Sequence, residues 1–220
     1  MYKIPSLWQR VKAHIHAWFI DHEMLRVFFR NFYKLDNNAF RSNHPSPRFI
    51  ARLKKRYGLK TIISLRKADD SGAYLLEKEA CDKLGIRLIN HKMASCKFPR
   101  PERIIEAKTL FDNIEYPALF HCKSGADRAG LMSVLYRHFK LGEPIEKARR
   151  ELSIKYGHFR WADTGKLDYF FDAYQDFNKQ NPDVSFSDWV EHHYDRDELD
   201  KHFHSAGWAN IVVHKILHRE

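Results

Sequence analysis

Cysteine is scarce in this sequence. The three that occur, Cys81, Cys96 and Cys122, form no Cys-x-x-Cys pair in a chain of 220 residues. Disulfide-stapled secreted domains and cysteine-rich zinc sites both need denser, regularly spaced cysteines, so the sequence argues against both classes. A single reactive thiol remains compatible with this pattern, and its natural setting is a reducing compartment. We therefore expect a cytoplasmic protein.

Long apolar runs are missing as well. No stretch of the sequence reaches the roughly 18 to 20 apolar residues that a membrane span needs. Polar residues such as His14 and Asp21 interrupt the region where a signal peptide would be apolar. The same region mixes basic residues with Trp8 and Trp18, as an interfacial helix would. Two interpretations remain for residues 1–34. Either the segment contacts the inner face of an anionic membrane, or its aromatic rings pack against the rest of the protein.

Acidic residues are outnumbered by basic ones, 28 against 38, which gives a formal net charge of +10. A positive field of this size favours anionic partners. The basic residues are scattered and no recognition motif accompanies them, so we expect no nucleic-acid partner. With 44% hydrophobic residues the chain can bury one sizeable core. We expect one main domain over residues 35–178, a helical segment before it and a helical appendage over 179–220.

Strand-like and helix-like segments alternate through the middle of the chain. The pattern predicts strands at 39–42, 61–65, 86–90 and 118–121, and helices at 47–57, 73–84, 101–113, 131–139, 144–156 and 166–177. Gly58 and Gly85 suit left-handed helix ends, and Pro101 suits a first helical position. Alternation of this kind indicates an α/β fold, here a single domain with a mostly parallel central sheet flanked by helices.

The most informative segment is His-Cys-Lys-Ser-Gly-Ala-Asp-Arg-Ala-Gly, residues 121–130, between an apolar strand and an apolar helix. Backbone N–H groups in such a turn, together with the positive end of the helix, can hold an oxyanion. The same donors and Arg128 would stabilise a thiolate at Cys122, and the arginine offers two parallel N–H groups to a phosphate. The combination suits attack on phosphorus with a phosphocysteine intermediate. The alternative is a buried structural cysteine.

His-Cys-x-x-Gly-x-x-Arg, followed by a small residue and glycine, resembles the signature of the cysteine-based protein tyrosine phosphatase superfamily, in its bacterial dual-specificity-like branch. Residues 39–47 and 59–66 resemble two strands of that branch, and the likeness covers about residues 30–175. The resemblance implies a cysteine-dependent phosphatase without metal or other cofactor. Cys122 is then the nucleophile, Arg128 the phosphate clamp and His121 a group that orients and acidifies the thiol. The implied phosphate-binding residues are His121, Lys123, Ser124, Gly125 and Ala126.

Two departures from the family pattern concern the mechanism. A hydroxyl residue usually follows the arginine and assists release of the thiolate, whereas Ala129 stands here, so hydrolysis is expected to be slow unless Ser124 or an ordered water substitutes. The usual acid is an aspartate well before the cysteine, and residues 91–102 contain none. Asp127 resembles the Gly-x-Asp-Arg variant of bacterial tyrosine and phosphoinositide phosphatases and of myotubularins, where the in-loop aspartate is the proposed acid. A structural carboxylate is the alternative, and His91 and Glu102 are further candidates for the acid.

The resemblance implies phosphotyrosine or phosphoserine/threonine in proteins as the first substrate class. Lys123 resembles the Cys-Lys-x-Gly pattern of lipid and phosphoinositide phosphatases, so anionic phospholipids or inositol phosphates are the alternative. A third reading, a phosphate-binding pseudophosphatase with little turnover, follows from Ala129 and the missing loop aspartate.

Three further features each admit two interpretations. Cys96 is either a second thiol that traps oxidised Cys122 as a disulfide or an ordinary loop cysteine. His158 and Arg160 either touch substrate or belong to an ordinary turn between helices. The histidines and acids of the tail are either a metal site or a solvated helix face, and their spacing matches no familiar ligand set. They are His192, His193, Asp195, Asp197, His202 and His204.

Overall fold

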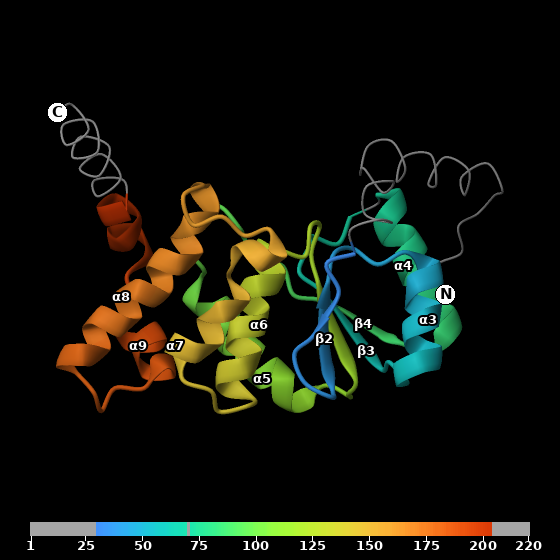
Figure 1. The fold of residues 1–220 in the computed structure, drawn as a ribbon, viewed down its shortest axis with the longest axis horizontal. Helices are drawn as coiled ribbons and strands as arrows, with labels where there is room; N and C mark the ends of the chain where they lie inside the picture. The colour runs from blue at the N-terminus through green and yellow to red at the C-terminus, as the bar shows by residue number, and fades with distance from the viewer. Residues whose placement is uncertain (1–29, 70, 204–220) are drawn as a thin grey trace.

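The structure is a computed structural model that describes residues 30–69 and 71–203. Its centre is a five-stranded sheet in the order β1-β2-β5-β3-β4 (Figure 1). The first strand pairs antiparallel with β2, and the other pairs are parallel. The mostly parallel α/β sheet predicted from the sequence is therefore confirmed. The strands are β1 (Tyr33–Lys34), β2 (Ala39–Ser42), β3 (Thr61–Ser64), β4 (Arg87–Asn90) and β5 (Ala118–His121).

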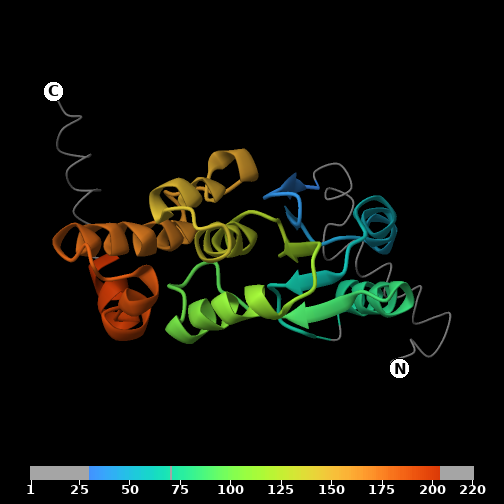
Figure 2. The ribbon, with the colours of Figure 1, turned by 90° about the horizontal axis from the view of Figure 1, so that it is seen from below.

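Helices cover both faces of the sheet, as Figures 1 and 2 show. One face carries α3 (Pro47–Tyr57) and α4 (Gly72–Leu84), and the other carries α5 (Pro101–Asn113) and α6 (Asp127–Phe139). Because successive side chains of a strand point to opposite faces, Leu119 and Phe120 of β5 enter two different apolar clusters. The central strand β5 is buried along its whole length. It ends at the segment of residues 121–130 that is predicted to bind phosphate, the phosphate loop.

The helix ends follow the predicted local chemistry. Gly58 and Gly85 have φ of 68° and 59°, the left-handed conformation that ends α3 and α4. Pro101 occupies the first turn of α5, where a missing N–H costs nothing. The helix after the phosphate loop begins at Asp127, four residues before the predicted start at 131, so the loop is shorter than its sequence suggests.

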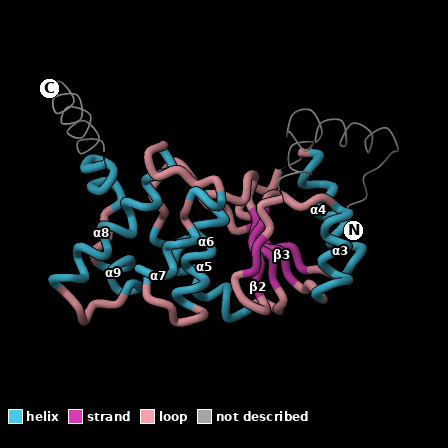
Figure 3. The backbone as a smooth tube through the Cα atoms, viewed as in Figure 1, coloured by secondary structure: helices cyan, strands magenta, loops and turns pink. Residues whose placement is uncertain are grey.

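One predicted helix is wrong. Residues 144–156 form a single turn, α7 (Ile145–Ala148), and then two short 3-10 turns, Arg149–Glu151 and Ile154–Tyr156 (Figure 3). The first 3-10 turn ends at Leu152, which is extended, and the buried carboxylate of Glu151 accepts hydrogen bonds from Arg41 and Arg137. In a continuous helix the backbone carbonyl of Glu151 and its carboxylate would not both face Nη1 of Arg41.

The C-terminal part contains α8 (Lys166–Gln180), where a helix is predicted at 166–177, and α9 (Phe186–His192). Residues 204–220 of the predicted helical appendage lie outside the described residues. Trp189 packs on Phe170 of α8, with ring centroids 5.4 Å apart, and both rings belong to the apolar cluster that also contains Cys122. Within the described part of the chain, no helix is long and apolar enough to span a bilayer. The predicted interfacial helix lies in residues 1–29, outside the described residues, apart from its last few positions.

Candidate active site

The phosphate loop begins directly after β5 and ends in the first turn of α6. Its cysteine, Cys122, is 1% exposed, and the N–H of Gly125 donates a hydrogen bond to its Sγ at 3.2 Å. The thiol therefore lies at the floor of the loop, beside the unpaired N–H groups that open α6. An N–H donor and a helix N-terminus both favour the thiolate over the thiol.

Gly125 is needed at this position for two reasons. Its φ of +78° lies in the left-handed region, which other residues rarely adopt. A Cβ there would lie 2.6 Å from the backbone N of Asn43 and 2.7 Å from the carbonyl carbon of Ser42. The loop thus packs its backbone directly against the end of β2, and only glycine leaves room for that approach.

Arg41 of β2 supports the loop from behind. Its guanidinium is fully buried, and Nη2 donates to the carbonyls of Gly125 at 2.7 Å and Ala126 at 3.0 Å. Its Nη1 donates to Glu151, at 2.7 Å to the carbonyl and 2.8 Å to Oε2, and the guanidinium carbon lies 3.9 Å from the ring centroid of Tyr156. Because Arg41 binds these two carbonyls from behind, it holds them on the side of the loop that faces β2. Sequence reasoning gave Arg41 no role.

Arg128 projects from the first turn of α6 toward the end of β3. Its Nη1 donates to the carbonyl of Leu65 at 3.4 Å, a long bond, and the side chain is half-buried. A guanidinium has five N–H donors in a rigid fork, so most of its donors are available to an oxyanion. The N–H of Met93 donates to the same carbonyl at 3.3 Å, so Leu65 links the segment after β4 to Arg128.

A buried acid lies beneath the loop. Glu77 of α4 is fully buried, and its Oε1 lies 2.6 Å from Nε2 of His121. Burial raises the pKa of Glu77, but the charges on His121, His44 and Arg66 outweigh burial and hold the pKa below its usual value. His121 therefore faces Glu77 on the far side of β5. Its Nδ1 lies 3.5 Å from the carbonyl oxygen of Cys122, so the ring also contacts the backbone of the loop, and its contact with phosphate stays a prediction.

His44, Glu77 and His121 bring ligand atoms within 4.8 Å of one another, the one set of three metal-binding side chains among residues 30–69 and 71–203. The direct His121–Glu77 contact accounts for this arrangement as an ion pair. The described part of the histidine-rich tail forms no such set.

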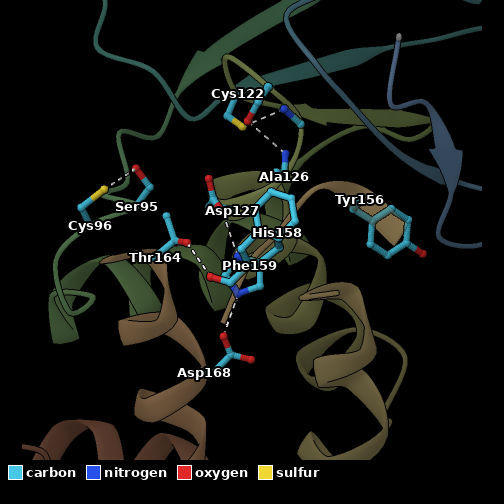
Figure 4. A network of polar contacts seen from close by, with 12 residues as sticks. Ser95, Cys96, Cys122, Ala126, Asp127, Tyr156, His158, Phe159, Thr164 and Asp168 are labelled. Atoms are coloured by element: carbon cyan, nitrogen blue, oxygen red, sulfur yellow. Dashed lines mark hydrogen bonds and ion pairs between the residues drawn. The ribbon is translucent and has the colours of Figure 1, made fainter. Parts of the chain in front are cut away.

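Asp127, the in-loop carboxylate, contacts a histidine from a distant segment. Its Oδ1 lies 2.8 Å from Nδ1 of His158, whose Nε2 lies 2.7 Å from Oδ2 of Asp168 in α8 (Figure 4). Burial lowers the pKa of His158, but hydrogen bonds to the two carboxylates and their charges outweigh it and raise the pKa to about 9. The sequence left two interpretations for His158, a substrate contact or an ordinary turn. Its position 31 residues after Asp127 gives no local signal of this pairing.

The sequence profile of the tyrosine phosphatase family matches residues 26–141, which is more than half of the 220 residues. The chain belongs to this family. A curated relative, inositol diphosphatase DSP4 of Arabidopsis thaliana, is 33% identical over 108 residues, 46% of this chain and 52% of that protein. The chain therefore spans about half the length of the relative it matches.

Solved structures of other proteins share the fold of this chain. TpbA of P. aeruginosa matches with a TM-score of 0.52 and 22% identity, over 66% of this chain and 84% of TpbA. Tk-PTP in its active form gives a TM-score of 0.52 and 16% identity, over 64% of this chain and 97% of Tk-PTP. At these identities the likeness concerns the fold alone. Residues 142–203, which hold His158 and Asp168, lie beyond the family match.

The other candidate acids lie outside the loop, one after β4 and one in α5. His91 is buried with Nε2 3.0 Å from the carbonyl of Arg103, and burial lowers its pKa. Glu102 is exposed in the first turn of α5. Cys96 is also exposed, and its Sγ contacts Oγ of Ser95 at 3.8 Å. Of the predicted acids, the structure brings Asp127 alone into the loop that carries Cys122.

The predicted phosphate-binding residues of the loop differ in their exposure to solvent. Lys123 and Ser124 are exposed at the mouth of the loop, whereas Gly125 and Ala126 are buried in its wall. Oγ of Ser124 accepts the N–H of Ala126 at 3.3 Å, so its O–H remains free to act as a donor. Ala129, which replaces the usual hydroxyl residue, is fully buried in α6.

A basic cavity of about 440 Å³ adjoins this site. Leu131 of α6 and Met93, which is tied to Arg128 through Leu65, form part of its wall. None of the described lining residues is acidic. Five of them are cationic: Lys92, Lys97, Arg100, Arg103 and Arg196. Arg103 pairs with Glu106, and the side chains of Lys92, Lys97 and Arg100 are exposed, so the cavity favours an anion.

Proposed function

We propose that this chain hydrolyses phosphomonoesters through a phosphocysteine intermediate on Cys122. The observation that carries the proposal is the hydrogen bond from Gly125 N–H to Cys122 Sγ in a loop that opens a helix. This arrangement stabilises a thiolate and offers N–H donors to the oxygens of the phosphate it attacks. Arg128 completes the cradle by binding two of those oxygens.

The reaction has two steps. In the first, the Cys122 thiolate attacks phosphorus, the bond to the leaving oxygen breaks, and Asp127 gives that oxygen a proton. In the second, water attacks the phosphocysteine, Asp127 takes a proton from the water, and the thiolate departs. The Gly125 N–H already donates to Sγ, so a donor for the departing thiolate is present although Ala129 supplies none. Preorganised donors of this kind supply the largest share of the rate enhancement.

Phosphotyrosine, phosphoserine and phosphothreonine in proteins are the first substrate class that we propose. A solved structure of TpbA, 21% identical to this chain, holds pTyr. Inositol phosphates or anionic phospholipids are the second class, because the five-cation cavity and Lys123 suit a substrate with more than one phosphate. The name of the Arabidopsis relative, an inositol diphosphatase, supports the same class.

Phosphate release from three panels tests both classes: phosphotyrosine peptides, soluble inositol phosphates and phosphoinositide vesicles. The wild type should release phosphate from at least one panel, and C122S should release none. R128K should lose most of the activity because lysine cannot bind two oxygens in parallel. Acid quench with ³²P-labelled substrate should trap the phosphocysteine. No turnover and no trapped intermediate in the wild type would favour the pseudophosphatase instead.

We further propose a cytoplasmic protein that touches the inner face of an anionic membrane through residues 1–34. The mixture of basic and aromatic residues in the sequence of that segment supports the proposal. Sedimentation with anionic liposomes at physiological salt, with and without residues 1–20, tests it. Equal binding by both chains would refute the membrane contact.

A further inference from the structure

His158 is held between two carboxylates that come from two different helices. Asp127 stands in the first turn of α6 and Asp168 in the first turn of α8, and each accepts from one ring nitrogen of His158. The imidazole side chain is 1% exposed, so water does not compete for either nitrogen. Asp127 is the partner that lies in the phosphate loop, which links this buried cluster to the reacting atoms.

Only a doubly protonated ring can donate to both carboxylates at once. Asp127 and Asp168 are the charged groups that act on the ring from α6 and α8, and together they raise the pKa of His158 to about 9 against the opposing effect of burial. At neutral pH the cluster is therefore an imidazolium between two carboxyl groups. Asp168, which lies outside the phosphate loop, balances the charge of the ring.

We propose that His158 is a positioning residue for the acid Asp127 and that Asp168 balances its charge. The inference rests on the proposed hydrolysis through Cys122. By donating to Oδ1, His158 fixes the carboxyl group so that Oδ2 serves the phosphate site. Figure 4 shows Asp127 between Cys122 and His158. Without Asp168, the bare imidazolium would favour ionised Asp127 so strongly that no proton would remain for the leaving group.

Asp127 alone can give and take the proton that the two steps of the reaction need. In the proposed substrate complex Asp127 carries a proton on Oδ2 beside the phosphate dianion, and this proton passes to the leaving oxygen as the phosphorus–oxygen bond breaks. The carboxylate that forms is stabilised by the N–H of His158. When water attacks the phosphocysteine, the Asp127 carboxylate takes the proton of the water and the electron pair of the sulfur–phosphorus bond returns to Cys122. His158 keeps both of its protons throughout, so it orients the acid without transferring a proton.

The test compares H158Q and D168N across pH with two aryl phosphates. Phenyl phosphate has a poor leaving group that needs an acid, whereas p-nitrophenyl phosphate has a good one that does not. In D168N the uncompensated imidazolium should move the basic limb of kcat/KM for phenyl phosphate to lower pH. In H158Q the uncompensated Asp168 should move it to higher pH. A shift of one pH unit changes the rate on that limb about tenfold, and p-nitrophenyl phosphate should show much less.

Two matched variants control for the loss of a buried group. D172N removes a carboxylate of α8 that pairs with Arg149 and Arg160, and H138Q removes a half-buried histidine of α6; neither should move the limb. Shifts in the same direction in H158Q and D168N, or equal losses with both substrates, would mean a structural role and overturn the inference.

Nuclear magnetic resonance of the histidine ring nitrogens gives a second readout that needs no turnover. His158 should stay doubly protonated from about pH 6 to about pH 8 in the wild type. It should lose a proton at lower pH in D168N, which keeps the test decisive if H158Q does not fold. A neutral ring at pH 7 in the wild type overturns the inference. If the ring behaves as expected while the wild type turns over no substrate, the proposed hydrolysis fails, and with it the positioning role.

Discussion

Replacing Arg41 by methionine removes the cation that binds the phosphate loop from behind. The guanidinium makes four hydrogen bonds of 2.7 to 3.0 Å, two to Glu151 and two to loop carbonyls. Methionine is of similar length but donates nothing. A buried polar group left unpaired costs about 1–3 kcal/mol, and a broken buried ion pair costs about 3–5 kcal/mol. These costs overlap, since Glu151 keeps its bond to Arg137, so we expect the free energy of unfolding to fall by about 4 kcal/mol.

Urea denaturation followed by circular dichroism measures this loss, and R56M is the matched control. Arg56 is exposed at the end of α3, and its replacement should change the free energy of unfolding by less than about 0.5 kcal/mol. At temperatures where R41M is still folded, its kcat should fall about 100-fold, because the loop amides lose their fixed direction. A loss below about 1 kcal/mol with unchanged kcat would refute the role given to Arg41.

Three other predictions follow from the site. G125A should lose at least about 100-fold in kcat, since its Cβ would lie 2.6 Å from a backbone nitrogen; a fully active variant would contradict the proposed loop geometry. The raised pKa of His158, about 9 against an ordinary 6.5, stabilises the fold fully below about pH 6.5, and this stability is lost as pH rises through about 9. Urea unfolding at several pH values should show the decline in the wild type and not in H158Q. The double variant K97A/R100A should raise KM for an inositol polyphosphate and leave KM for p-nitrophenyl phosphate unchanged; equal KM values for both would argue against the basic cavity as a binding site.

The elements that the sequence predicted well carry their signals locally. The helix Pro47–Tyr57 has a proline in its first turn and Gly58 after its end, and both boundaries agree with the prediction. The strand before the phosphate loop is a short apolar run bounded by Pro117, and the loop itself holds its cysteine, glycine and arginine within a few positions. Such signals need no knowledge of the rest of the chain.

The features that the sequence did not reveal depend on residues far apart. Arg41 and Glu151 are separated by 110 positions, and nothing in the sequence near either residue shows that the two charges are buried together in the fold. The same pairing ends the predicted helix over 144–156, because the chain must turn to present Glu151. Glu77 was missed, and the sequence left the role of His158 open, for the same reason: a buried charge is recognised by its partners, and these lie on other elements.

The bonds from Arg41 to the loop carbonyls have a consequence for how the protein loses activity. Since one side chain joins β2, the phosphate loop and the turn at Glu151, we expect the loop to unfold together with the rest of the domain. Heating should abolish turnover and secondary structure in one transition, and substitutions around Glu151 should lower that transition temperature without altering any residue that touches phosphate.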